Sequence, residues 1–100
     1  MSERQLAYED FADKVGEVFP IGDEDVPRIP LTLVETEMLK ANGLEPGMRA
    51  PFALTFIAKD PRVLPQRIYR LEHNGLGSLA IFLVPIAKSA DGVSYQATFN

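Results

Sequence analysis

The stretch YRLEHNGLGSLAIFLVPI, from Tyr69 to Ile86, decides the fold because it holds two strands and the turn that joins them. Before the turn, apolar and polar residues alternate, as in a strand with one buried face. After the turn, the run LAIFLV (residues 79–84) is apolar on both faces, so both of its sides need a covering layer. The dipeptide Asn74-Gly75 is typical of a hairpin turn. The stretch therefore predicts a β-hairpin.

The register of this hairpin depends on the length of its loop. A two-residue loop would place apolar residues opposite polar ones. A three-residue loop, 74–76, pairs Leu71 with Leu79 and Tyr69 with Ile81, and the apolar residues then share one face. Because a slip of one residue turns every side chain to the other face, we predict the three-residue loop.

Pro85 limits how the second strand of the hairpin can pair, because proline has no N–H to donate to a ladder. We expect this long strand to pair first with residues 67–73, to bend near Pro85, and then to pair with the terminal strand. The dipeptide at 91–92, Asp-Gly, is a second hairpin signal and would place Ser89 opposite Ser94.

The rest of the chain predicts a mostly β fold with one short amino-terminal helix at about residues 8–15. Phe11, Ala12 and Val15 form the apolar stripe of that helix, and Gly16 follows as a stop signal. We expect one domain over residues 1–100, in which about 17–100 form a small antiparallel barrel or sandwich of about six strands. The predicted strands are EVFPIG (17–22), RIPLTLVETEML (28–39), FALTFIA (52–58), RIYRLEH (67–73), SLAIFLVPIA (78–87) and VSYQATFN (93–100), with loops at 40–51 and 59–66.

Composition excludes several classes of function. The apolar content of 46% and the charged content of 24% are those of an ordinary folded domain. The net charge of −4 does not provide the basic field that nucleic acids or anionic membranes attract. No stretch reaches the roughly 18 apolar residues of a membrane span, and the polar amino terminus does not resemble a secretory signal. The absence of cysteine removes disulfides and thiolate chemistry, so we expect a cytoplasmic protein.

Two long segments, residues 8–19 and 65–100, resemble a family of small bacterial domains of unknown function. The resemblance implies no known activity, and members of that family look like neighbours of phage-tail-like genes. This chain departs from the family before the Glu-Asp-Phe segment, where the family often has a Ser or Thr helix cap and this chain has Leu6, Ala7 and Tyr8. The residues that carry the resemblance are Pro65, Gln66, Tyr69, Arg70, Leu71, His73, Leu76, Gly77, Phe82 to Ile86, Asp91, Gly92, Tyr95, Ala97, Phe99 and Asn100.

Catalytic chemistry would have to use His73, the only histidine, with a nearby carboxylate such as Glu72. The predicted register puts Ser78, the nearest serine, on the face opposite to His73, so no Ser-His pair forms. We therefore interpret His73 as the end of a strand. Carboxylates at 35, 37 and 72 fall on predicted strands, but no pattern selects a pair for glycoside hydrolysis.

Metal and cofactor sites find no support in the sequence. The acidic turn GDEDVP, residues 22–27, lacks the alternate ligand spacing of a calcium loop, and we interpret it as a solvated turn. The segment GLGS joins two strands rather than opening a helix, so it is not a phosphate-binding loop. We expect no cofactor and no bound metal.

Four residues are candidates for a partner surface: Phe82, Val84, Phe99 and Asn100. Phe82 lies on the second face of its strand, where we expect the amino-terminal helix to cover it; if it is not covered, it belongs to a partner surface. A strand ending at Asn100 would also offer an edge to a partner strand.

Three functions remain open on these grounds. The favoured one is a non-enzymatic protein-interaction or assembly module, accessory to a phage-tail-like structure, with a protein partner or a second copy. The alternatives are a small-ligand-binding β barrel and an enzyme that uses His73 with a carboxylate. A barrel this small is usually filled by its own side chains, which ranks the second hypothesis lower.

Overall fold

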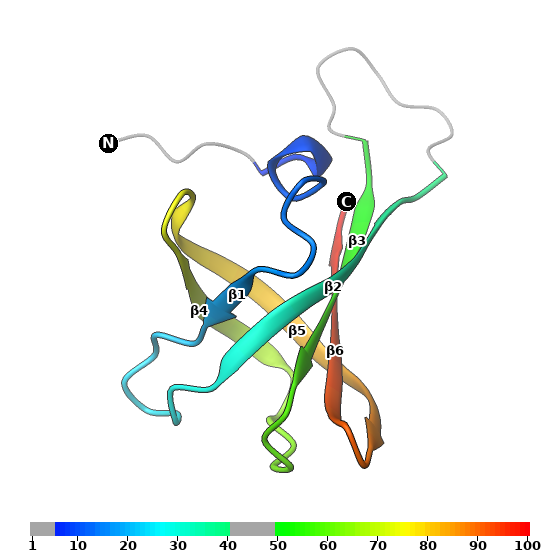
Figure 1. Ribbon diagram of the computed structural model, residues 1–100. Coiled ribbons are helices and arrows are strands. Elements are labelled where there is room, and N and C mark those ends of the chain that lie inside the picture. Colours follow the sequence, from blue (N-terminus) through cyan, green and yellow to red (C-terminus); the bar gives the residue numbers. More distant parts are fainter. Residues whose placement is uncertain (1–5, 41–49) are drawn as a thin grey trace.

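The computed structural model describes residues 6–40 and 50–100, and in this part of the chain six antiparallel strands curl into a nearly closed barrel (Figure 1). The strands follow the order β1-β2-β3-β6-β5-β4 around the sheet. The prediction of a mostly β antiparallel fold is confirmed, and the architecture is a barrel. The elements are a 3-10 turn η1 (Tyr8–Asp10), β1 (Val18–Pro20), β2 (Pro30–Met38), β3 (Phe52–Ala58), β4 (Arg67–His73), β5 (Gly77–Ser89) and β6 (Gly92–Phe99).

The long strand β5 pairs with a different neighbour along each half of its length. Its first half, to Leu83, pairs with β4, and its second half, from Val84, pairs with β6. A bulge separates Pro85 from Ala87 at the start of the second half. Because Pro85 cannot donate to the ladder, the strand bends there, as the sequence predicts.

The β4–β5 hairpin has the predicted register. Leu71 faces Leu79, Tyr69 faces Ile81, and the loop between the strands has three residues, 74–76. The side chains of Tyr69, Leu71, Leu79, Ile81 and Leu83 therefore point into the barrel. The barrel interior is filled by buried side chains that include Phe19, Ile21, Leu31, Leu33, Leu54, Phe56, Tyr69, Leu71, Ile81, Leu83 and Tyr95.

The register predicted for the last hairpin is wrong. Ser89 pairs with Gly92 rather than with Ser94, so the turn residues are Ala90 and Asp91. Gly92 is part of the strand because it lies directly on the carbonyl of Ala58 at the end of β3, and a Cβ there would overlap that oxygen. Its φ of 134° also suits glycine alone.

The predicted helix at residues 8–15 is also wrong, because η1 ends at Asp10 and residues 11–16 form turns. Residues 15 and 16 form a turn, and the chain is then hydrogen-bonded to β2: the N–H of Gly16 donates to the carbonyl of Leu33 (2.7 Å), and the N–H of Leu33 donates to the carbonyl of Glu17 (3.0 Å). This pairing leaves Val15 52% exposed instead of packed on the barrel.

The amino-terminal segment covers the end of the barrel rather than its outer wall. Phe11 is fully buried, and its ring lies 6.0–6.3 Å from the rings of Phe19, Phe52 and Phe99. It does not reach the outside of β5, so Phe82 is 47% exposed, against the prediction that a helix would cover it.

The sequence suggested that the terminal strand lies at an edge of the sheet. It does not, because β6 lies between β3 and β5. The edges are instead β1 and β4. Of the loop predicted at 40–51, residues 41–49 lie outside the described residues. The loop predicted at 59–66 is present. No helix among the described residues is long and apolar enough to span a membrane.

Two glycines with positive φ provide a test of the close contact between Gly92 and β3. Gly92→Ala combines a strained backbone with the overlap on Ala58, so we expect a loss of about 3–5 kcal/mol in the free energy of unfolding. Gly77→Ala, where φ is 80° but no atom lies within 4 Å of the new Cβ, should cost only about 1–2 kcal/mol. Urea denaturation of both variants measures the difference, and equal losses would contradict the assigned contact.

Candidate functional site

Three of the polar features that the sequence singled out, His73, Glu72 and the acidic turn 22–27, lie where the barrel closes, between β1 and β4. We call this line the seam. A single bridge, Ile21 to Leu71, joins the two edge strands, and beside it the N–H of Gly22 donates to the carbonyl of Arg70 at 2.8 Å. The remaining links across the seam are made by side chains.

His73 lies at one end of the seam and pins three parts of the chain together. Its Nδ1 lies 3.0 Å from the backbone nitrogen of Gly75 and 3.1 Å from that of Leu76. Both N–H groups donate to Nδ1, so the ring proton resides on Nε2, which donates to Glu17 Oε1 at 2.6 Å. The ring also stacks on Phe19, with centroids 4.6 Å apart. His73 thus caps its own turn and ties β4 to β1.

Glu72 and His73 are adjacent in sequence, but the structure does not bring their side chains together as a pair. The carboxylate of Glu72 lies outside the barrel and accepts from Arg28 Nη1 at 2.7 Å. It passes directly over Gly22, where a Cβ would overlap it. The carboxylate that contacts the imidazole comes from Glu17, and no motif in the sequence marked that residue.

A shallow depression of about 630 Å³ opens over this end of the seam. Two of its polar side chains have partners within the chain: both ring nitrogens of His73 are engaged, and the Glu72 carboxylate is paired with Arg28. In this arrangement no imidazole lone pair is left to take a proton from a substrate hydroxyl. The depression is lined chiefly by Glu17, Val18, Arg28, Glu72, His73 and Ser78.

The acidic turn is bound to β4 as well as solvated, which its sequence did not show. Arg67 donates to both carboxylate oxygens of Asp25, at 3.0 and 3.2 Å. Asp23 Oδ1 accepts the backbone N–H of Arg70 at 2.6 Å, and the Arg70 guanidinium donates to the carbonyl of Gly22. The hydrogen bonds from Arg67 hold the pKa of the Asp25 carboxyl below its ordinary value of 3.8.

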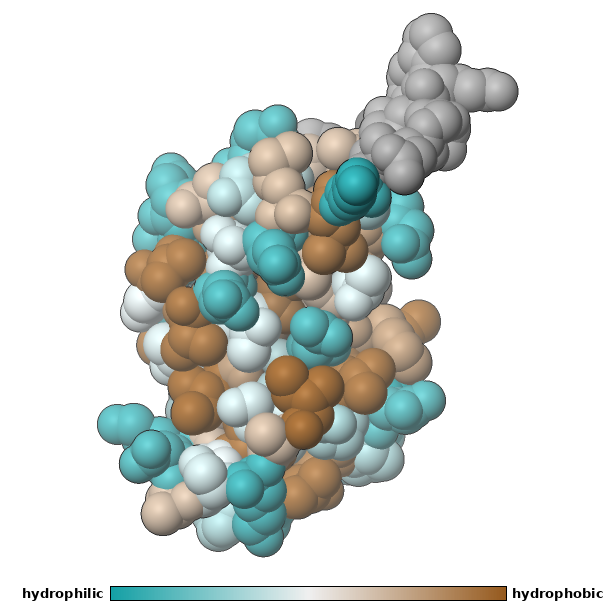
Figure 2. Space-filling model, turned by 90° about the vertical axis from the view of Figure 1, so that its right-hand side faces the viewer, coloured by the Kyte–Doolittle hydropathy of each residue, from teal (hydrophilic) through white to brown (hydrophobic). Residues whose placement is uncertain are grey.

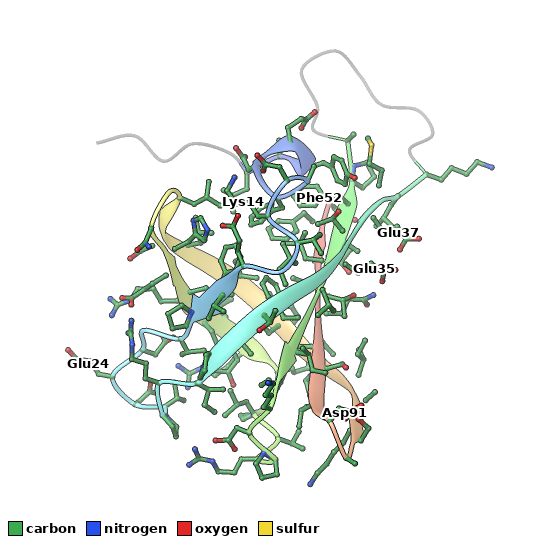
Figure 3. All side chains as sticks on the ribbon, in the orientation of Figure 1. Lys14, Glu24, Glu35, Glu37, Phe52 and Asp91 are labelled. Atoms are coloured by element: carbon green, nitrogen blue, oxygen red, sulfur yellow. The ribbon has the colours of Figure 1, made fainter. Side chains whose placement is uncertain are left out.

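The other carboxylates considered as candidates in the sequence lie apart from the seam. Glu35 and Glu37 project away from the barrel on β2, and Glu24 points into solvent from the connection between β1 and β2 (Figure 3). Within residues 6–40 and 50–100, no three side chains of His, Cys, Asp or Glu come together as a metal site would require.

The four candidate partner-surface residues do not form one patch. Phe82 points outward from β5 and Val84 is half-buried on the same strand. Phe99 instead faces the barrel end, where its ring stacks on Phe52 with centroids 4.5 Å apart. Asn100 is exposed at the end of the chain. The outward neighbour of Phe82 is Ile68, directly opposite on β4 and 61% exposed, which the sequence reading missed.

The chain belongs to the family described as Domain of unknown function (DUF6916), whose model matches residues 6–99. This agrees with the resemblance to a family of small domains without a known activity. No curated protein and no solved structure gives a significant match to the chain.

Substitutions at His73 test its role as a cap. His73→Ala removes the acceptor of two backbone N–H groups and the stacking on Phe19, so we expect a loss of about 2–3 kcal/mol in unfolding free energy. His73→Asn keeps an acceptor oxygen near the position of Nδ1 and should lose about half as much. Urea denaturation measures both, and an alanine variant as stable as the parent would contradict the assigned cap.

Lowering the pH should protonate Asp25 and remove the stabilisation that its pair with Arg67 provides. Because the folded-state pKa of Asp25 is lowered, the stabilisation is complete above its ordinary pKa of 3.8 and is lost as the pH falls through the folded value. NMR of the carboxyl carbons should show that the pKa of Asp25 lies below 3.8 in the parent protein. In Arg67→Gln this pKa should rise toward 3.8. Asp60, whose pKa Arg62 lowers to about 2, serves as the control and should not change in that variant.

Proposed function

We propose that this DUF6916 domain is a non-enzymatic protein-interaction module that binds its partner through the outer face of β4 and β5. One observation carries the proposal. Ile68 and Phe82 face each other directly across the two strands on the outside of the barrel, and they are 61% and 47% exposed. A paired aromatic and branched aliphatic side chain on a rigid sheet is the kind of anchor that protein interfaces bury.

The surroundings of this pair support a protein partner. Val84 extends the apolar strip along β5, and Ile86, the extra residue of the bulge, is 51% exposed. Arg70, on the neighbouring outward row of β4, offers a polar rim. In the view of Figure 2, apolar (brown) and polar (teal) side chains both reach the surface, and apolar ones adjoin one another along its left side. A continuous apolar pair beside a charged group favours recognition of a folded protein surface.

The two alternatives have less support. The side chains that fill the barrel leave little room for a ligand inside it, which argues against a small-molecule carrier. An enzyme using His73 would first have to break the hydrogen bonds that occupy both ring nitrogens. An accessory role in a phage-tail-like structure is the narrower form of our proposal, and its support is the sequence resemblance alone.

Site-specific photo-crosslinking tests the proposed surface. A photoreactive phenylalanine at position 82 should give a discrete crosslinked product in cells, and Ile68→Ser should reduce its yield about tenfold. The matched control is the same photoreactive residue at Val63, which is 51% exposed on a different part of the molecule. Sedimentation of the pure protein over a concentration series then tells whether the partner is a second copy.

Equal crosslinking from positions 82 and 63, together with a monomer at every concentration, would contradict the proposed surface. A product from position 82 that Ile68→Ser leaves unchanged would contradict it as well, because the two side chains are adjacent on the same face.

A further inference from the structure

The connection between β1 and β2 lies as a strap across the edge of β4. We define the strap as residues 22–28. Its base is fixed: Ile21 and Ile29 are buried, and the N–H of Ile21 donates to the carbonyl of Ile29 at 3.0 Å. Its outer part is polar and exposed at Glu24, Asp25, Pro27 and Arg28. The strap therefore has a fixed base, and its tip is held by contacts with β4 and by Val26, which is half-buried and packs against the core.

Charged groups make most of those contacts. Asp23 and Asp25 face Arg67, with closest distances of 3.6 and 3.0 Å, and Arg28 faces Glu72 at 2.7 Å. These pairs join distant parts of the sequence and all cross the seam. The pairs Lys14–Asp13 and Arg62–Asp60, in contrast, join near neighbours in the chain.

The strap also takes the place of a neighbouring strand on β4. The N–H of Arg70 donates to the carboxylate of Asp23, where the carbonyl of a paired strand would otherwise accept. The carbonyl of Arg70 accepts from Gly22. The strap thus covers the edge of β4, next to Ile68, with a side chain and one backbone group rather than with a full ladder.

We propose that the strap is a lid on the edge of β4 and that it opens while the barrel stays folded. The charge pairs that the strap makes with Arg67 and Glu72 control this opening. The fully buried side chains of Tyr69 and Leu71 keep β4 on the core, whereas the strap contacts the core through the half-buried Val26, so the strap is the part that moves. Opening frees the N–H and carbonyl of Arg70 for another hydrogen-bonding partner. This inference does not depend on the apolar surface proposed above.

Amide hydrogen exchange, followed by NMR, measures the opening directly. The amides of Gly22 and Arg70 report on the strap, and the amides paired between β3 and β6 report on the whole barrel. Raising the salt from about 0.05 to about 1 M should speed exchange at the two strap amides about three- to tenfold, because exposed charge pairs are screened. Exchange in the β3–β6 ladder should stay the same.

Two variants separate the strap pairs from general charge effects. Asp25→Asn removes a charge that faces Arg67 and should speed exchange at Gly22 and Arg70 about threefold or more even in low salt. Asp60→Asn removes a charge of equal size from a local pair and should leave both amides unchanged.

The proposal predicts a further rescue. Arg28→Glu and Glu72→Arg should each speed exchange at the strap, and the double variant should restore the parent rate. If the strap amides exchange only together with the β3–β6 ladder, or if Asp60→Asn acts as strongly as Asp25→Asn, the strap does not open on its own and the proposal is wrong.

Discussion

The missing amide hydrogen of Pro85 is the constraint on which this barrel depends. Strand β5 pairs with β4 as far as Leu83 and with β6 from Val84, and Pro85 stands where the strand changes partners. A proline cannot continue a ladder on its N–H side, so the strand bends and the bulge takes up Ile86. That bend carries β4 round to β1 instead of leaving it at the far end of an open sheet. The seam, and the strap that crosses it, follow from this one position.

The parts of the fold that the sequence predicts well are those set by alternation and by proline. The β4–β5 register follows from matching Leu71 with Leu79, because a slip of one residue would bury polar side chains. The errors arose where distant contacts overrule local signals. Gly92 looked like a turn residue but belongs to β6, since only glycine fits against Ala58. The stripe around Phe11 suggested a helix, but the chain forms turns there and its Gly16 N–H bonds to Leu33 of β2.

The candidate site shows the same division between local and distant information. Period-two alternation correctly turns Phe82 outward, but its exposure depended on where the amino-terminal segment packs. Sequence adjacency pointed to Glu72 as the partner of His73, although neighbouring residues on a strand face opposite sides. The actual partner, Glu17, is 56 positions away and carries no local signature. A single sequence could therefore identify His73 but not the contacts that define its role.

The short pairing between β1 and β4 also has a consequence for how the chain folds. Every other pair of neighbouring strands is joined by a ladder of several residue pairs. Ile21 and Leu71, which half of the chain separates in sequence, are joined by one bridge. Closing so long a loop costs chain entropy that one bridge cannot recover until the core has formed. We therefore expect barrel closure at Ile21 to be a late event in folding. The β4–β5 hairpin, with its three-residue loop, is suited to form early, and we expect assembly to proceed from the carboxy-terminal half of the chain toward its beginning.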